Sequence, residues 1–271
     1  MPELPEVETT LRGIEPYLLG NRIIRIVVRE KRLRWPVSNE LLTLANRKVT
    51  ALNRRAKYLL VSLGNAEHII IHLGMSGSLR IVDTDSEVKK HDHLDFHLSC
   101  NKILRYHDPR RFGAVLWTDE LVADHLLLKS LGPEPLSNEF HGPHLFAASR
   151  KRKMAVKNLI MDGHIVVGVG NIYASEALFL AGVRPGKAAG RVTAKQYGDI
   201  ATSIKDVLGK AIKQGGTTLR DFVNSDGQPG YFQQTLNVYG RTDEPCHVCQ
   251  SAIKSKVIGQ RSTFYCAQCQ Q

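Results

Sequence analysis

The stretch Leu131-Gly-Pro-Glu-Pro-Leu136 divides the chain into two parts with different hydrophobic patterns. Its two prolines and one glycine interrupt helices and strands alike. Short apolar runs before it predict strands, whereas apolar residues after it recur at helical spacing. We therefore predict a linker at residues 131–150, between a strand-rich domain at 1–130 and a helical domain at 151–234.

Residues 22–118 are predicted to form a sheet, because no long helix interrupts their short runs of Ile, Val and Leu. Gly and Asn turns separate the runs, which is typical of antiparallel sandwiches and barrels. His93–Leu98 alternates strictly between polar and apolar residues, as a half-buried strand does. The predicted strands are Arg22–Arg29, Val49–Leu52, Tyr58–Leu63, His68–His72, Ser78–Val82 and His93–Leu98.

Helices are predicted before the first strand and after the linker. Apolar residues three and four apart predict a helix over residues 5–19, which Pro16 is expected to bend or shorten. Thr193 is a good N-cap for the longest of the later helices. Those helices are Lys153–Met161, Asn171–Ala181 and Ala194–Lys213.

The cysteines predict a metal site near the C-terminus. Four of the five cysteines form two Cys-x-x-Cys pairs. Two redox-active dithiols are the alternative, but the presence of two such pairs close together favours a zinc ribbon, predicted over residues 235–271. Four thiolates close the coordination tetrahedron of Zn²⁺ and leave no position for a substrate, so the zinc would be structural. Cys100 stands apart and is assigned no role. The predicted ligands are Cys246, Cys249, Cys266 and Cys269.

The chain is strongly basic, with a formal net charge of +11 at pH 7. An excess of this size indicates a polyanionic partner, nucleic acid first and a membrane surface second, while a merely basic protein is the alternative. No apolar run reaches the roughly 18–20 residues of a membrane span. The N-terminus also lacks the basic and apolar regions of a signal peptide. We therefore expect a cytoplasmic protein.

The N-terminal sequence Met1-Pro-Glu-Leu-Pro-Glu combines an amine with acids. Removal of Met1 would give Pro2 a free secondary amine, and an α-amine has an ordinary pKa of about 8, so that much of it is uncharged near neutral pH. Such an amine can attack a carbon and form a cationic iminium, which is an electron sink. The alternative is that Glu3 and Glu6 merely favour the first turn of a helix.

Two loops carry side chains that could enter a DNA duplex. Residues 108–113 contain Arg110 and Phe112, and residues 72–77 contain Met75. Apolar side chains between base steps unstack DNA, and an enzyme that extracts a base must fill the gap that it leaves. Arg110 could then hydrogen-bond the abandoned partner base. Taken singly, Phe112 and Met75 are more typical of core packing.

Other segments predict phosphate contacts. Lys57 follows two arginines at a strand end and could hold a phosphate or form a Schiff base, or simply lie on a solvated basic edge. Residues 167–176 are not a dinucleotide fingerprint, because Tyr173 takes the third glycine position and no βαβ unit surrounds them. A turn there leads into a helix at Asn171, whose N-terminus would bind a phosphate unless the turn has no ligand. Arg261 lies between the cysteine pairs, where a hairpin tip could contact phosphate.

Together these motifs resemble the bacterial formamidopyrimidine-DNA glycosylases, which remove 8-oxoguanine and ring-opened purines. The resemblance runs essentially end to end, and no motif position departs from the family pattern. The matching stretches are residues 1–9, 54–59, 72–77, 108–113, 167–176, 228–232 and the zinc ribbon.

The resemblance implies an α+β multidomain fold with an N-terminal antiparallel β-sandwich, a helix-two-turns-helix domain and a C-terminal zinc ribbon. It implies a bifunctional DNA glycosylase and AP lyase of base excision repair, which works through an N-terminal proline Schiff base and β,δ-elimination. One structural Zn²⁺ and no organic cofactor are expected. The expected partner is double-stranded DNA containing oxidised purines, bound by a monomer at the nucleoid.

The family pattern assigns catalytic roles to five residues. Pro2 would attack C1′ of the damaged nucleoside, Glu3 would transfer protons, and Glu6 would support the same site. Lys57 would contact phosphate and aid the elimination. Arg261 would hold the phosphate during the later elimination.

The family pattern also assigns DNA contacts. Met75, Arg110 and Phe112 would fill the void, pair with the orphan cytosine and wedge the duplex. The Gly-rich loop 215–231, which the composition predicts to be mobile, would close over the flipped base. The remaining family DNA-contact positions are His72, His91, Arg152, Asn171 and Tyr239.

Two other functions stay open from the sequence. An endonuclease VIII-type enzyme shares the proline chemistry but removes oxidised pyrimidines; Leu4 and the pair Arg110 and Phe112 favour the purine enzyme. A non-catalytic zinc-ribbon DNA-binding protein would explain the charge and the zinc, but not the acidic terminus around Pro2.

Overall fold

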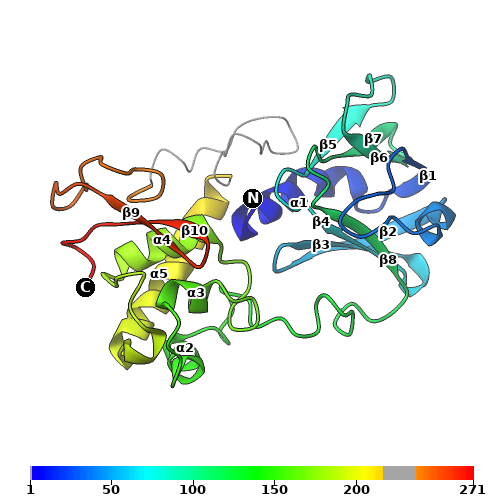
Figure 1. Ribbon diagram of the computed structural model, residues 1–271. Helices are drawn as coiled ribbons and strands as arrows, with labels where there is room; N and C mark the ends of the chain where they lie inside the picture. Colours follow the sequence, from blue (N-terminus) through cyan, green and yellow to red (C-terminus); the bar gives the residue numbers. More distant parts are fainter. Residues whose placement is uncertain (1, 216–235) are drawn as a thin grey trace. The chain divides into compact units, whose positions relative to one another are not determined.

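The computed structural model describes residues 2–215 and 236–271, which belong to two units (Figure 1). The sandwich unit contains the described chain up to Lys129, together with Gln214 and Gly215. The helical unit contains Ser130–Lys213 and the described residues from Leu236 onward. The change of unit therefore directly precedes the proline-containing stretch at 131–136. No helix in the described ranges is long and apolar enough to cross a membrane.

The strands of the sandwich unit form one antiparallel sheet in the order β5-β7-β6-β1-β2-β3-β4-β8. β1 and β2 pair only through Arg22 with Lys48 and Ile23 with Arg47, so the sheet divides into two four-stranded halves. Buried side chains from both halves form one hydrophobic core, as in a β-sandwich. The predicted fold class is confirmed. The strands are β1 Arg22–Val28, β2 Arg47–Arg55, β3 Tyr58–Leu63, β4 His68–His72, β5 Ser78–Asp83, β6 Asp92–Leu98, β7 Lys102–His107 and β8 Ala114–Thr118.

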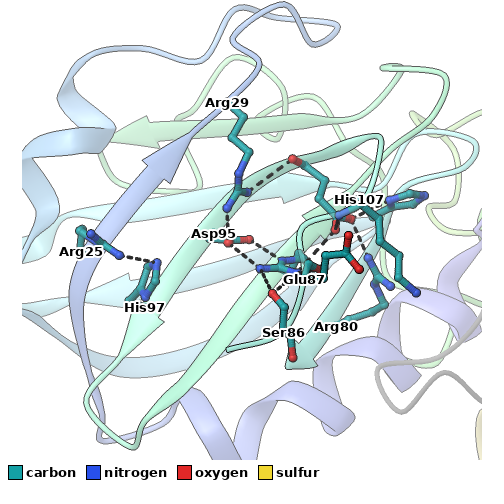
Figure 2. A network of polar contacts seen from close by, with 11 residues as sticks. Arg25, Arg29, Arg80, Ser86, Glu87, Asp95, His97 and His107 are labelled. Carbon is teal, nitrogen blue, oxygen red and sulfur yellow. Dashed lines mark hydrogen bonds and ion pairs between the residues drawn. The ribbon is translucent and has the colours of Figure 1, made fainter. Parts of the chain in front are cut away.

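Strand β6 differs from its prediction. The alternation in His93–Leu98 predicts one exposed face, yet nearly every side chain of β6 is buried. Its polar face is covered by charged side chains of neighbouring strands and by the segment after β5 (Figure 2). Arg105 of β7 donates to the carbonyl of Glu87 in that segment at 2.8 Å. The alternation of polar and apolar residues in β6 therefore separates two buried faces, one apolar and one ionic.

The ionic face is a network around two buried carboxylates (Figure 2). Arg105 donates to both oxygens of Asp95, each at 2.9 Å, and Arg29 donates to the same carboxylate. Asp92 accepts a hydrogen bond from the His107 ring at 2.8 Å. The charged side chain of Arg105 on β7 is thus an interior residue, which explains why hydrophobic patterning does not single out this strand.

Helix α1, Leu4–Leu18, precedes the strands and packs against β2, β3 and β5 (Figure 1). Its buried face includes Val7, Leu11 and Ile14, at the spacing that predicts the helix. Pro16 does not shorten it, because a proline in the last turn removes only one hydrogen bond near the C-terminal end.

The helical unit differs from its prediction in the linker. The second half of residues 131–150 forms helix α2, Gly142–Ser149, which packs against α5. A β-carbon on Gly142 would lie 2.7 Å from the Gly198 Cα, so the two helices meet where neither residue has a side chain. Locally, the helix start has only a His141 side chain that accepts the His144 N–H and a proline at position 143. The other helices are α3 Val156–Ile160, α4 Asn171–Leu180 and α5 Ala194–Lys213, and the short 3₁₀ segments are η1 Glu40–Leu44, η2 Gly64–Ala66 and η3 Ala189–Arg191.

The C-terminal ribbon consists of β9, Lys254–Ile258, and β10, Arg261–Tyr265. Both turn residues between them, Gly259 and Gln260, have positive φ, as a two-residue type I′ hairpin requires. Buried residues of the ribbon pack against Phe179 of α4. The ribbon and α4 therefore share one hydrophobic cluster.

Candidate active site and nucleic-acid interface

Helix α1 begins with a capping box built from two predicted catalytic residues. The Glu3 side chain accepts a hydrogen bond from the Glu6 N–H, and the Glu6 carboxylate accepts one from the Glu3 N–H at 2.8 Å. Both residues are only 2% exposed, and Pro2 is buried directly before them. Two carboxylates thus lie next to the proline at the positive end of a helix, where they can take up and return a proton.

Lys57 lies in the tight turn between β2 and β3. The neighbouring Arg54 donates to Glu8 of α1 at 2.9 Å and to the Ala56 carbonyl at 2.9 Å. The ion pair attaches the Lys57 hairpin to the first turns of α1. Lys57 and the residues at the start of α1 are therefore held in the same part of the sandwich unit.

His72, at the end of β4, is held in its neutral form. Burial lowers the pKa of His72 to about 4, with further lowering by the charges of Lys57 and Arg34. Its Nδ1 accepts the Gly74 N–H at 3.0 Å, so Nε2 carries the ring proton. The ring can offer a phosphate an uncharged hydrogen bond but no ion pair.

Strand register brings three loops to one end of the sandwich unit. Ser78 at the start of β5 and Asp92 at the start of β6 both pair with His107 at the end of β7. His72 at the end of β4 pairs with Ala114 at the start of β8. These three loops are residues 73–77, 89–91 and 108–113, and they are together called the loop end below.

The loop end presents the predicted DNA-inserting residues to solvent. Met75 is 36% exposed and Phe112 is 45% exposed, so neither packs in the core as its residue type taken singly predicts. The Arg110 guanidinium lies 4.9 Å from the centroid of the Phe112 ring. His91 is half-buried, with a positive φ of 73°. An exposed cation, thioether and aromatic ring on adjacent loops can contact bases and phosphates.

In the helical unit, the start of α4 is tied to the ribbon. The Asn171 side chain donates to the Ser262 carbonyl at 2.9 Å and accepts from the Lys157 ammonium. Lys157 also donates to the Thr263 hydroxyl at 2.7 Å. Asn171, α3 and β10 thus form one polar cluster beside a helix N-terminus, which is a suitable place for a phosphate.

Arg261 is exposed at the start of β10, directly after the hairpin turn. A β-carbon on Gly259 would lie 2.6 Å from the Asn158 side chain, so the turn packs closely on α3. Because Asn158 and Lys157 are adjacent on α3, the same helix positions the hairpin and the Asn171 amide. Arg261 and Asn171 therefore belong to one surface of the helical unit.

The two remaining predicted contacts lie elsewhere in the helical unit. Arg152 is exposed in the loop after α2, where its carbonyl accepts the Gly190 N–H at 2.9 Å. Tyr239 is half-buried with its ring 4.9 Å from that of Phe264, and its N–H donates to Glu176 at 2.9 Å. The predicted lesion-recognition loop, 215–231, lies outside the described residues apart from its first position.

The four C-terminal cysteines fit a tetrahedral metal. Their sulfur atoms all lie within 4.8 Å of one another, and two of the pairs are 3.9 and 3.4 Å apart. Zn–S bonds of about 2.3 Å give tetrahedral S···S edges of about 3.8 Å, whereas a disulfide needs about 2.05 Å. The donor set is therefore that of a closed, structural Zn²⁺ site, as predicted.

Sequence patterns miss Lys157. It is fully buried and joins the Asn171 amide to the ribbon, yet the sequence shows only one lysine in an apolar helix. Lysine is almost never fully buried unless paired, so a Lys within Val156–Ile160 is the signal that could have identified it.

Three family models match the chain. A formamidopyrimidine-DNA glycosylase N-terminal domain matches residues 1–115, and a formamidopyrimidine-DNA glycosylase H2TH domain matches residues 131–223. A zinc finger found in FPG and IleRS matches residues 243–271. The matches cover most of the chain and include the four-cysteine cluster.

Full-length relatives give the same result. A protein of Alteromonas mediterranea named formamidopyrimidine-DNA glycosylase is 57% identical over 272 residues, covering 100% of both chains. The Lactococcus lactis Fpg (MutM) structure with DNA containing N7-benzyl-Fapy-dG is 34% identical, with a TM-score of 0.92 and complete coverage of both chains. A complex of the same protein with DNA containing an oxidised pyrimidine is 33% identical, with a TM-score of 0.91 and the same coverage.

Proposed function

The chain belongs to the formamidopyrimidine-DNA glycosylase family, and on this premise we propose that it excises oxidised purines from duplex DNA and then cleaves the strand. It is a DNA glycosylase of base excision repair with a structural zinc. The observation that carries the finer proposal is the start of α1, where Pro2 precedes two buried carboxylates that cap each other's backbone.

The first step uses the amine that Pro2 gains when Met1 is removed. Its nitrogen attacks C1′ of the damaged nucleoside while the bond from C1′ to the base breaks, and Glu3 transfers the proton that the departing base needs. Ring opening of the sugar then gives a cationic iminium between Pro2 and C1′. Glu6 acts through Glu3, because its carboxylate holds the Glu3 N–H.

The second step breaks the DNA strand. The iminium draws electrons from C1′, which acidifies the C2′ proton and allows a base to remove it. The resulting electron pair expels the 3′ phosphate, and a second elimination expels the 5′ phosphate. The product is a gap of one nucleotide with a phosphate at each end.

Phosphate binding assists both eliminations. Lys57 in the sandwich unit and Arg261 in the helical unit supply positive charge, which stabilises an oxyanion as it leaves. Asn171 offers an amide at a helix N-terminus, oriented by its contacts with Lys157 and Ser262. The neutral ring of His72 supplies a hydrogen bond without charge.

The loop end is proposed to occupy the duplex after base extraction. Met75 and Phe112 are exposed apolar side chains of the kind that separate base steps, and Arg110 can donate to the unpaired base. The contacts at His91, Arg152 and Tyr239 are proposed to follow the DNA backbone. We propose that the protein acts as a monomer in the cytoplasm. Light scattering would test the monomeric state by measuring the molar mass of the free protein.

Borohydride trapping tests the chemistry. The protein, with removal of Met1 verified by mass spectrometry, is incubated with a duplex containing 8-oxoguanine opposite cytosine. A reduced adduct mapped to Pro2 is expected, together with a strand break; Pro2→Gly leaves a primary amine, whose imine must gain a proton to become an electron sink, and should therefore slow both while still binding DNA. Absence of the adduct from a chain that begins at Pro2 would contradict the proposal and leave a non-catalytic DNA-binding protein.

A second substrate distinguishes the purine enzyme from the pyrimidine alternative. The relative crystallised with an oxidised pyrimidine makes this comparison necessary. Duplexes with 8-oxoguanine, formamidopyrimidine or thymine glycol are compared under single-turnover conditions. Faster excision of both purine lesions is expected, and a preference for thymine glycol would favour the endonuclease VIII type.

A further inference from the structure

The loop end contains a buried carboxylate that the proposed chemistry does not use. Asp108 is 0% exposed and directly follows β7. One of its oxygens accepts the Ser76 hydroxyl at 2.8 Å. The other accepts the Gly113 N–H at 2.9 Å and the Tyr106 hydroxyl at 3.2 Å. Ser76 belongs to the loop of Met75, and Gly113 directly follows Phe112, so a single carboxylate joins both loops.

The backbone of Asp108 extends this connection to the third loop. Its N–H donates to the His91 carbonyl at 3.1 Å. Its own carbonyl accepts a hydrogen bond from the His93 ring at 2.8 Å. The residues on both sides of Asp92 are thereby fixed to the end of β7. All three loops of the loop end therefore meet at Asp108.

Ser76 adds a second connection between the two inserting loops. Its hydroxyl donates to Asp108 and accepts the Arg110 N–H at 3.2 Å. This bond fixes the backbone of the residue proposed to pair with the orphan base. The Met75 loop and the Arg110 backbone therefore cannot shift independently without losing this partly buried hydrogen bond.

Glycines bring the loops into direct backbone contact. A β-carbon on Gly74 would lie 2.4 Å from the Gly113 nitrogen, and Gly74 has a positive φ of 65°. A β-carbon on Gly113 would lie 1.8 Å from the Tyr106 hydroxyl oxygen. Neither position has room for a side chain, so the two loops touch along their main chains and any movement of one displaces the other.

The choice of a carboxylate is informative. Among the described residues, no ion pair within 4.0 Å reaches Asp108, and its partners are hydroxyl and amide donors. Burying an unpaired carboxylate is costly unless several hydrogen bonds satisfy it. Only a carboxylate can accept on both oxygens from three donors that come from different segments. Asp108 is therefore better suited to joining these segments than to filling space in the core.

We propose that Asp108 is a positioning residue that couples the three loops of the loop end into one rigid DNA-inserting unit. The role in base extraction rests on the proposed function, because Met75, Arg110 and Phe112 must enter the duplex for it to matter. The coupling itself is a property of the free protein.

The first test measures the coupling without any reaction. Hydrogen exchange is followed in the full chain for peptides that cover the loop end, in wild type, Asp108→Ala and Ser76→Ala. Both variants are expected to increase exchange in residues 73–77 and 108–113 together. Ser78→Ala removes another buried hydroxyl two residues further along and serves as the matched control. An increase confined to the mutated loop would overturn the coupling.

The second test measures its consequence for the reaction. Excision of 8-oxoguanine by Asp108→Ala is expected to fall about 10- to 100-fold, since a misplacement of about 1 Å can cost that much. Strand cleavage at a preformed abasic site should change less than threefold, because no base has to be extracted. Equal losses in both reactions would show a general structural defect and overturn the positioning role.

Two further variants make the test independent of folding. Asp108→Asn can keep Gly113 and Tyr106 on its oxygen and donate to Ser76, so it should recover most of the excision rate. Combined with Met75→Ala, Asp108→Ala should cost less than in wild type, because both act through the same insertion. Strict additivity would overturn the proposal. Coupled exchange in a wild type that forms no adduct would refute the proposed function and leave the coupling intact.

Discussion

Replacement of Arg105 by Met tests whether the ionic network of Figure 2 is needed for the stability of the sandwich unit. The Arg105 side chain is 3% exposed and donates to both oxygens of Asp95 at 2.9 Å. Met retains much of the volume but leaves Asp95 buried with Arg29 as its remaining cationic partner. The Glu87 carbonyl loses a donor as well.

The expected loss follows from the buried Asp95 carboxylate, which keeps Arg29 but loses both hydrogen bonds from Arg105. Removing one partner of a buried pair costs about 3–5 kcal/mol. At about 2–4 °C per kcal/mol for chains of 150–250 residues, the melting temperature of the sandwich unit should fall by about 6–20 °C. Arg32→Met is the control, because Arg32 pairs with Glu30 at the surface and its side chain is 81% exposed. That variant should melt as wild type does.

Tryptophan fluorescence is the assay, because both tryptophans of the chain, Trp35 and Trp117, lie in the sandwich unit. Urea and thermal unfolding are followed for wild type, Arg105→Met, Asp95→Asn and the double variant. The double variant should be more stable than Arg105→Met, because the amide removes the buried charge. A melting temperature of Arg105→Met equal to that of the control, or additive effects in the double variant, would refute the reasoning.

The network also predicts an acid dependence. Burial raises the pKa of Asp95, but the hydrogen bonds from Arg105 and Arg29 more than offset this, so the pKa lies below its ordinary value. A carboxyl group with a lowered folded-state pKa stabilises the protein fully above its unfolded-state pKa of about 3.9. That stabilisation is lost as the pH falls below this value. Arg105→Met should lose this part of the acid dependence.

Three further outcomes are expected. Chelation of zinc should unfold the ribbon and abolish DNA binding, because small four-thiolate sites fold with their metal; circular dichroism and a binding titration measure both, and retained binding would contradict it. Arg261→Gln should slow strand cleavage and reduce the salt slope of log Kd by about 1, while an unchanged slope would remove Arg261 from the phosphate contacts. His72 binds a proton more weakly in the folded state, where its pKa is about 4, than in the unfolded state, so it should destabilise the fold progressively as pH falls from about 6.5 towards 4. His72→Gln should flatten the stability profile in that window, and an unchanged profile there would refute the assignment.

Much of the fold could be predicted because its signals are local. β3, β4 and α5 have the predicted bounds, since short apolar runs and a helical stripe after Thr193 need no distant partner to be recognised. Thr193 forms a reciprocal capping box with Gln196, and the two residues are only three positions apart in the sequence. The zinc ligands followed from spacing in the same way, whereas the family and the full fold class came from the resemblance that the motifs carry.

The missed elements depend on contacts between distant residues. α2 needs Gly142 to meet Gly198, and β7 needs its Arg105 to be buried against Asp95. Glycines are typical of loops and charged residues of surfaces, so these contacts leave no hydrophobic pattern; α2 has only its His141 cap and Pro143 as local signals. Lys157 was missed for the same reason, since its acceptors lie on α4 and β10.

By itself, the sequence determined which chemical groups the protein carries and the class of fold that presents them, because motif, spacing and periodicity are properties of neighbouring residues. The tertiary structure alone decided that Met75 and Phe112 are exposed, that His72 is neutral, and that three loops meet at Asp108. Exposure, proton affinity and mechanical coupling are set by what surrounds a side chain. Those surroundings come from strand register and close backbone packing between segments that are far apart in the chain.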